Sequence, residues 1–387
     1  MLARTATAWL AAAGMFLQSN FAIGDGVGQG IEAFARGDYA AAHASFAVAG
    51  EDGDSRASPW LAADYYVGWG AKANDMLAQR WLETAKNQSA ADDLEQAVDH
   101  WRKLADAGDP SGTVALGRAY ENGIGVTASP VEAYRLYKIA ADRGHARGQY
   151  ALAAMYASGV GVKADSKEAM RLFNLAAAQG DDWSQYQIGG AFLTGTGVRR
   201  NLRTASEWLT RAAQAGNALA MYNLAVMYDQ GDGVRQDYAE AYRWYKQAAI
   251  HGVPNAQNNL AVLHYRGQGV AKDVGAAFEF STIARDQGSL AGPSDGTFDF
   301  AYRTIQAELS EPERRAAVFH LGERCRDGDS LPRDAIQAYR YMTIAINTEP
   351  EAALKEQRTR IRDAMAATMR GAQVARAQSL AESAGPP

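Results

Sequence analysis

The sequence has little cysteine, little proline and no excess of positive charge. Its single cysteine, Cys325, excludes an intramolecular disulfide. Proline contributes only 10 of the 387 residues, as is typical of a chain that forms mainly helices. The formal net charge is −5, and no basic stripe of the kind that binds nucleic acid occurs. These absences argue against a disulfide-stabilised module and against a nucleic-acid-binding protein.

Glycine, in contrast, is frequent and strictly spaced. One glycine recurs every 36 residues across residues 108–288, at Gly108, Gly144, Gly180, Gly216, Gly252 and Gly288. A fixed period of about 20–50 residues indicates one supersecondary unit that is stacked on itself. Positions within each copy are numbered below from its leading glycine, so that +8 is the eighth residue after it.

Two helical patterns follow each leading glycine. The first pattern has a large residue at +8, a small residue at +9 and an aromatic residue at +12. The second pattern has alanine at +25, a large residue at +28 and alanine at +32. The copy after Gly216 shows them as Leu224, Ala225, Tyr228, Ala241, Trp244 and Ala248. Spacings of three and four residues place side chains on one face of a helix. A Gly-x-Gly-Val turn separates the two patterns, so each copy predicts an antiparallel helix pair.

The repeated text A-x-Y-N-L-A-x-M-Y-x-x-G-x-G-V, followed by D-Y-x-E-A-x-x-W-Y-x-x-A-A-x-x-G, resembles the Sel1-like repeat family. This family is related to tetratricopeptide repeats, and the resemblance covers five consecutive copies. It implies an all-α protein, a right-handed α-solenoid of stacked antiparallel helix pairs. No pair can bury its apolar face alone, and the neighbouring pair supplies the missing surface.

Less regular segments flank the regular copies. Residues 25–107 contain degenerate helical repeats, with an insertion before Gly108, and residues 108–288 contain the five regular repeats. Residues 289–387 contain an irregular loop, a degenerate repeat and a polar C-terminal capping helix. Cys325 occupies +12 of that degenerate repeat, where we interpret it as a small buried apolar side chain.

Residues 1–24 read as a secretory signal peptide. Arg4 precedes the apolar run Ala6–Leu17, which is too short to span a bilayer comfortably, and small residues near Ala22 and Gly24 allow cleavage. This pattern predicts a periplasmic or secreted protein that is soluble after removal of the signal. The alternative is an apolar starting segment that is not cleaved.

The sequence carries no recognisable catalytic or metal-binding motif. Gly-x-Ser-x-Gly, Ser-x-x-Lys and His-Glu-x-x-His are all missing, and the six histidines are dispersed. Only His264 falls on the core pattern, at +12, where a packed side chain is the preferred interpretation. We therefore expect no catalytic residue, no metal site, no cofactor and no enzymatic activity.

Candidate binding residues come from an analogy with tetratricopeptide arrays, whose first helices line a concave face. By that analogy +3, +6, +10 and +13 would point inward. The residues selected on this basis are Arg147, Tyr150, Trp183, Tyr186, Tyr222 and Asn258. Tyrosine, tryptophan and arginine are common anchors in protein interfaces. The alternative is that the tyrosines at +6 pack on the next helix; Trp183 stands out because no other +3 residue is aromatic.

Two functions follow as hypotheses. The first is a non-enzymatic scaffold or adaptor in the cell envelope, which binds a protein or peptide on the concave face. The second is recognition of a cell-wall glycan or polysaccharide, or a part in a polysaccharide export or assembly complex, since aromatic rows also suit sugar faces. The identity of the partner stays open at this point.

Overall fold

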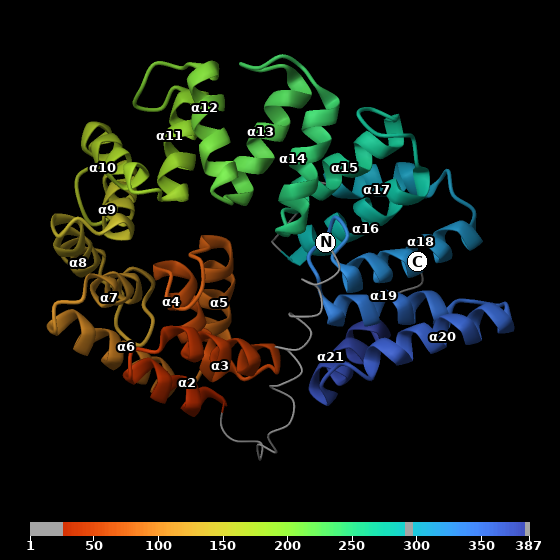
Figure 1. The fold of residues 1–387 in the computed structure, drawn as a ribbon, viewed down its shortest axis with the longest axis horizontal. Coiled ribbons are helices and arrows are strands. Elements are labelled where there is room, and N and C mark those ends of the chain that lie inside the picture. Colours follow the sequence, from red (N-terminus) through yellow and green to blue (C-terminus); the bar gives the residue numbers. More distant parts are fainter. Residues whose placement is uncertain (1–25, 291–296, 384–387) are drawn as a thin grey trace, which may run out of the picture. The chain divides into compact units, whose positions relative to one another are not determined.

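Every regular element in the part of the chain that the structure describes is a helix (Figure 1). The computed structural model describes residues 26–290 and 297–383, so the predicted signal peptide of residues 1–24 lies outside the described residues. None of the described helices has the length and apolar character needed to traverse a bilayer. The chain divides into two compact units, residues 1–97 and 98–387.

The first unit is built around a cluster of aromatic side chains. Its elements are α2 (Gly26–Ala35), α3 (Tyr39–Glu51), the short 3-10 helix η1 (Ser55–Ala57), α4 (Ser58–Val67), α5 (Asp75–Gln88) and the start of α6 (Ala91–Asp106). The Trp60 ring is buried, stacks on Phe46 at 5.2 Å and meets Phe34 edge-on at 5.2 Å. These rings fill the core of a small helical unit.

The second unit holds the regular repeats, and each repeat is an antiparallel helix pair as predicted. The pairs are α7 (Pro110–Asn122) with α8 (Pro130–Asp142), α9 (Ala146–Ser158) with α10 (Ser166–Ala178), α11 (Asp182–Thr194) with α12 (Leu202–Gln214), α13 (Ala218–Gln230) with α14 (Tyr238–Ile250), and α15 (Pro254–Arg266) with α16 (Val274–Leu290). Successive pairs lie side by side in chain order (Figure 1). The predicted all-α solenoid of stacked helix pairs is therefore confirmed.

The predicted core positions +8, +25 and +32 are buried in every copy, whereas the +12 residue is half-buried in most copies. The large residues at +8 are Leu116, Leu152, Ile188, Leu224 and Leu260, and all of them are buried. The alanines at +25 and +32 are also buried and let the two helices of a pair approach closely. Most of the repeat helices begin at a capping side chain; the Asp165 carboxylate, for example, accepts hydrogen bonds from the first turn of α10.

The second glycine of the Gly-x-Gly-Val turn marks a contact between repeats as well as a turn at Gly161, Gly233 and Gly269. Gly269 has φ +70°, and a Cβ built on it would lie 2.2 Å from the carbonyl oxygen of Tyr238, at the start of the preceding repeat's second helix. A Cβ at Gly161 would meet the Pro130 carbonyl oxygen at 2.5 Å in the same way. The turn therefore sits directly on the neighbouring pair, where only glycine fits.

Five further helices complete the second unit. They are α17 (Thr297–Gln306), α18 (Glu311–Asp327), α19 (Ala335–Asn347), α20 (Ala352–Ala366) and α21 (Gly371–Glu382). The polar segment expected to form one capping helix forms two, α20 and α21. The chain turns between Ala367 and Arg370 and resumes at Gly371, a residue that is unfavourable inside a helix.

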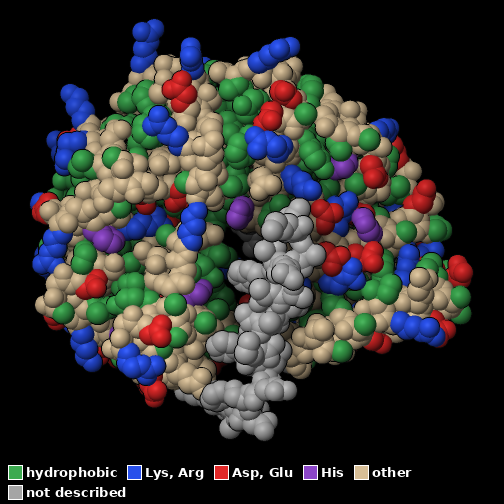
Figure 2. Space-filling view, in the orientation of Figure 1, with side chains coloured by type: hydrophobic (Ala, Val, Ile, Leu, Met, Phe, Trp, Pro, Cys, Tyr) green, Lys and Arg blue, Asp and Glu red, His purple; other side chains and the backbone are tan. Residues whose placement is uncertain are grey.

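Charged side chains of both signs are interspersed on the face drawn in Figure 2. Several charged side chains of the second helices form ion pairs within one helix, such as Arg171 with Glu168 and Arg243 with Glu240. Exposed pairs of this kind contribute at most about 1 kcal/mol each, so they keep the outer helices solvated more than they stabilise the fold.

Candidate partner-binding surface

The residues predicted to bind a partner lie on four successive first helices of the second unit. Arg147 and Tyr150 are on α9, Trp183 and Tyr186 on α11, Tyr222 on α13 and Asn258 on α15. Arg147, Tyr150 and Asn258 are buried, whereas Trp183, Tyr186 and Tyr222 are half-buried and keep accessible surface. The structure thus divides the six into a packed group and an accessible group.

Four of the six form one continuous cluster across the boundary between α9 and α11. The Trp183 ring lies 6.5 Å from the Tyr150 ring and meets Tyr186 edge-on at 5.7 Å. The Arg147 guanidinium lies 5.4 Å from the centre of the Tyr150 ring. The ring of Tyr222 packs instead against Tyr245, at 6.0 Å. Trp183 is the accessible centre of this cluster.

Arg147 is held by an ion pair within the protein. Its guanidinium lies 3.3 Å from the carboxylate of Asp181, and both side chains are buried. The same aspartate caps α11, since the backbone N–H of Ser184 donates to it at 2.7 Å. Arg147 therefore joins two repeats, and it offers little surface to a partner.

The tyrosines at +6 take part in packing between neighbouring first helices. Tyr186 shares a hydrogen bond with Asn223 on α13, and Tyr222 shares one with Asn259 on α15. Burial raises the pKa of Tyr186 and of Tyr222, so both hydroxyls stay protonated at neutral pH. Packing is thus established for these residues, while contact with a partner stays a prediction.

These hydrogen bonds reveal a row of carboxamides that sequence reasoning overlooked. Position +7 carries Gln187, Asn223 and Asn259 in three consecutive copies, and all three are half-buried. The two copies before them carry alanine at +7, so the change from alanine to carboxamide was visible in the aligned repeats. The row runs directly beside Tyr186 and Tyr222.

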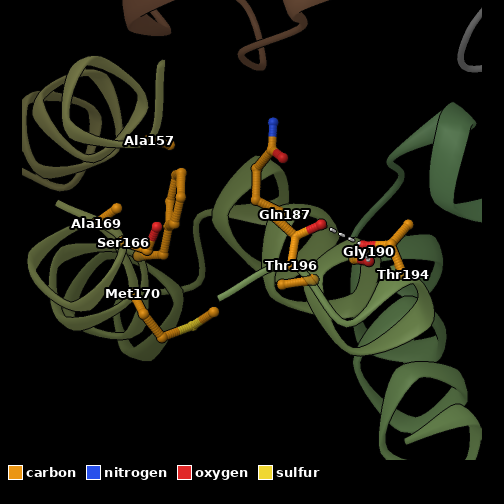
Figure 3. Close-up of a pocket in the computed structure, with 10 residues that line it drawn as sticks. Ala157, Ser166, Ala169, Met170, Gln187, Gly190, Thr194 and Thr196 are labelled. Carbon is orange, nitrogen blue, oxygen red and sulfur yellow. Dashed lines mark hydrogen bonds between the residues drawn. The ribbon is translucent and has the colours of Figure 1, made fainter. Parts of the chain in front are cut away.

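A pocket of about 320 Å³ lies between the pair α9–α10 and helix α11. Figure 3 shows Ala157, Ala169, Ser166 and Met170 on one side and residues of α11 and the following turn on the other. The other side carries Gln187, Gly190, Thr194 and Thr196. The two threonine hydroxyls are 2.8 Å apart and hydrogen-bond each other. All of the lining residues are uncharged.

The cysteine and the histidine that fall on the core pattern of the sequence, Cys325 and His264, are packed inside the described structure. No group of three or more His, Cys, Asp or Glu side chains there could hold a metal ion. Burial raises the pKa of Cys325 to about 12, so its thiol is protonated and unreactive, and the predicted burial of this residue is confirmed. His264 is packed, as predicted, with its ring stacked on Phe280 at 5.5 Å.

Fold and surface together define a helical-repeat protein with an uncharged aromatic and carboxamide surface. The chain belongs to the Sel1 repeat family. The model of this family, described as the Sel1 repeat, matches residues 60–89, 91–109, 110–145, 146–181, 184–217, 218–253, 254–289 and 315–347, well over half of the chain. Sel1 repeats generally form scaffolds for protein–protein interaction and are typically non-catalytic. The resemblance seen in the sequence is confirmed, and it extends into both flanking segments.

Solved structures with a similar fold come from several bacteria. A Sel1 repeat protein from Oxalobacter formigenes is 24% identical, with 70% of this chain and 98% of that chain covered and a TM-score of 0.47. A protective antigen present in uropathogenic Escherichia coli strains is 22% identical, with 88% and 93% covered and a TM-score of 0.38. An immunity protein from Pseudomonas aeruginosa is 17% identical, with 59% and 82% covered and a TM-score of 0.36. No curated protein matches the chain significantly.

Proposed function

We propose that this protein is a non-enzymatic scaffold that binds a peptide segment of a partner protein on the first helices α9, α11, α13 and α15. The observation that carries the proposal is the row of carboxamides at Gln187, Asn223 and Asn259 beside the half-buried rings of Trp183 and Tyr186. A carboxamide offers two donors and an acceptor with two lone pairs. The Tyr186 hydroxyl uses only part of the capacity of Asn223, and the rest suits the N–H and C=O groups of an extended peptide.

The proposed partner segment is rich in uncharged residues. The one arginine of the predicted surface, Arg147, is already paired with Asp181 inside the protein. Trp183 contributes a large ring that keeps accessible surface, and buried aromatic contacts supply much of the affinity of protein interfaces. Apolar anchoring by Trp183 and backbone hydrogen bonding by the carboxamides would then act together.

Glycan recognition is the weaker of the two hypotheses. A sugar ring stacks on a flat aromatic face, whereas the rings of Trp183 and Tyr186 are inclined at 79° and meet edge to face. This arrangement does not give a row of coplanar platforms. A glycan array probed with the same protein distinguishes the two hypotheses.

A place in the cell envelope is part of the proposal and rests on the sequence of residues 1–24. Cell fractionation, together with the mass of the exported chain, tests it. An N-terminus near Gly24 in the exported fraction supports cleavage of a signal peptide. An intact chain confined to the cytoplasmic fraction contradicts this part of the proposal.

The central test is affinity capture with the mature chain, followed by direct titration of the captured partner. The Trp183→Ala, Tyr186→Ala double variant should lose the partner, because it removes the accessible anchor and the tyrosine beside the carboxamides. Trp208→Ala is the matched control, since this half-buried tryptophan lies on the second helix α12. Equal capture by the double variant and the wild type would contradict the proposed surface.

A further inference from the structure

Among the four boundaries between the regular repeats, only the one that holds the pocket between α9–α10 and α11 has small residues at three neighbouring positions. Position +11 is Ala191 here, whereas the repeats that start at Gly144, Gly216 and Gly252 carry Met155, Met227 and Leu263 there. Each of those larger side chains is 2% exposed, so each fills the space at its own boundary. The pocket therefore lies where a methionine or leucine side chain lies at the other boundaries.

The positions around Ala191 are small as well. Position +10 is Gly190, where the same three repeats carry Ala154, Val226 and Val262. Opposite, +13 of the preceding repeat is Ala157, where the other three boundaries have Glu121, Leu193 and Asp229. A Cβ built on Gly190 would meet no atom within 4 Å. Three small residues at one boundary thus leave a pocket open. At the other boundaries, larger side chains of the protein occupy the equivalent space.

The pocket is continuous with the proposed binding surface. Gly190 lies on the same stripe of α11 as Trp183 and Tyr186, because residues three to four apart share one face of a helix. Gln187 belongs both to the pocket lining and to the row of carboxamides. A peptide backbone at Gln187 would therefore pass the entrance of the pocket.

The lining selects an uncharged side chain. Met170, Phe173 and three alanines form its apolar part, and the remaining polar groups are hydroxyls and the Gln187 carboxamide. A lysine or glutamate side chain would lose its hydration without gaining an opposite charge, which is strongly unfavourable. A methionine or leucine side chain would make the contacts that Met155, Met227 and Leu263 make at the other boundaries.

We infer that this pocket binds a leucine or methionine side chain of the partner peptide, in the place that a side chain of the protein occupies at the neighbouring boundaries. The inference rests on the proposed function, and it adds the residue type that the partner presents. The pocket would determine specificity, while the carboxamide row holds the backbone without regard to sequence.

The test uses N-acetyl-leucine methylamide and N-acetyl-methionine methylamide as probes, with the lysine and glutamate derivatives for comparison. The methyl group of Met170 lies in the lining, so its NMR signal reports occupation directly. The leucine and methionine probes should shift that signal saturably, and the charged probes should not. Absence of a saturable shift with the first two, or equal shifts with all four, overturns the inference.

A filled pocket provides the decisive variant. Ala191→Met installs the residue that two neighbouring repeats carry at +11, so the variant should fold with an unchanged or higher melting temperature. Its affinity for the leucine probe should be at least about tenfold lower than that of the wild type. Leu175→Met, on the exposed side of α10, is the control and should bind as the wild type does. Wild-type affinity in a folded Ala191→Met protein overturns the inference.

The partner itself separates the two proposals. If the Trp183→Ala, Tyr186→Ala variant loses the partner but Ala191→Met retains it at full affinity, the proposed function stands and the role of the pocket is wrong. If Ala191→Met loses both the probe and the partner, the pocket and the surface act as one site.

Discussion

The guanidinium of Arg147 lies 3.3 Å from the carboxylate of Asp181, and the two side chains are only 6% and 4% exposed. The pair joins +3 of one repeat to the helix cap of the next. At the preceding boundary, the same two positions carry Ser111 and His145 instead of an ion pair. Ser111 Oγ lies 3.2 Å from His145 Nε2 there. A residue that sequence analysis assigned to partner binding thus belongs to the contact between repeats.

Arg147→Ala should lower the free energy of unfolding by about 3–5 kcal/mol, because it leaves the Asp181 carboxylate buried without its partner. Urea denaturation measures this loss. Arg171→Ala serves as the comparison, since Arg171 is 57% exposed and pairs with Glu168 at the surface, where the expected loss is below about 1 kcal/mol. Similar losses in the two variants would contradict a structural role for the Arg147–Asp181 pair.

Two turn glycines allow the conformational and the steric contributions of glycine to the stability of the protein to be measured separately. Gly144→Ala places a Cβ at φ +80° with no atom within 4 Å, so only the left-handed backbone is disfavoured, by about 1–2 kcal/mol. Gly269→Ala adds a Cβ that would lie 2.2 Å from the Tyr238 carbonyl oxygen. Chemical denaturation should show roughly 1–3 kcal/mol of additional destabilisation for Gly269→Ala. Equal losses would mean that the turn does not press on the preceding repeat.

Local patterns made the helix pairs predictable, because the spacing of residues such as Leu224, Tyr228 and Ala241 reflects contacts within one pair. The contacts between pairs were less accessible to sequence reasoning. The closeness of Gly269 to Tyr238 joins residues of two successive copies, and nothing in either copy alone indicates it. The break before Gly371 was missed because the segment is polar and alanine-rich on both sides, as a single helix would be.

The candidate site, like the fold, was predictable within one repeat but not across the boundary between two repeats. Trp183 was selected because no other +3 residue is aromatic, and it does keep accessible surface. The pocket was overlooked, because it depends on small residues at +10 and +11 of one copy facing a small residue at +13 of the copy before. The residues concerned, Gly190, Ala191 and Ala157, are each unremarkable in a helix rich in alanine and glycine. Comparing whole boundaries rather than single positions would have found them.

His264 should make the stability of the protein depend on pH. Burial lowers the pKa of His264 below its ordinary value of 6.5, and its Nδ1 has no hydrogen-bond partner among the described residues. The unfolded chain therefore binds a proton more readily than the folded protein does. The free energy of unfolding should be unaffected by this group above pH 6.5 and should decrease as the pH falls below it, by at most about 1.4 kcal/mol per pH unit.

His264→Phe tests this pH dependence, because Phe192 occupies the same +12 position in another copy. The variant should lose part of the pH dependence between pH 7.5 and 5.5 (roughly the range in which a histidine titrates), measured by urea denaturation. Other groups contribute to what remains: burial also lowers the pKa of His145, whereas burial raises the pKa of Asp64 to about 6 and the hydrogen bond with Glu279 raises the pKa of His320, and these two act in the opposite direction. An undiminished slope in His264→Phe would contradict the assignment.

Gln257 marks a boundary where a polar side chain reduces the stability of the stack. The side chain is fully buried, and neither carboxamide atom has a hydrogen-bond partner among the described residues. The repeat before it carries Met221 at this +5 position, also buried. Because an unsatisfied buried polar group is unfavourable by about 1–3 kcal/mol, Gln257→Met should raise the free energy of unfolding by a similar amount. The control is Gln185→Met, whose gain should be smaller because Gln185 Nε2 already donates to the Ala177 carbonyl oxygen at 3.4 Å. A Gln257→Met protein that unfolds at lower urea concentration than the wild type would show that the carboxamide stabilises this boundary.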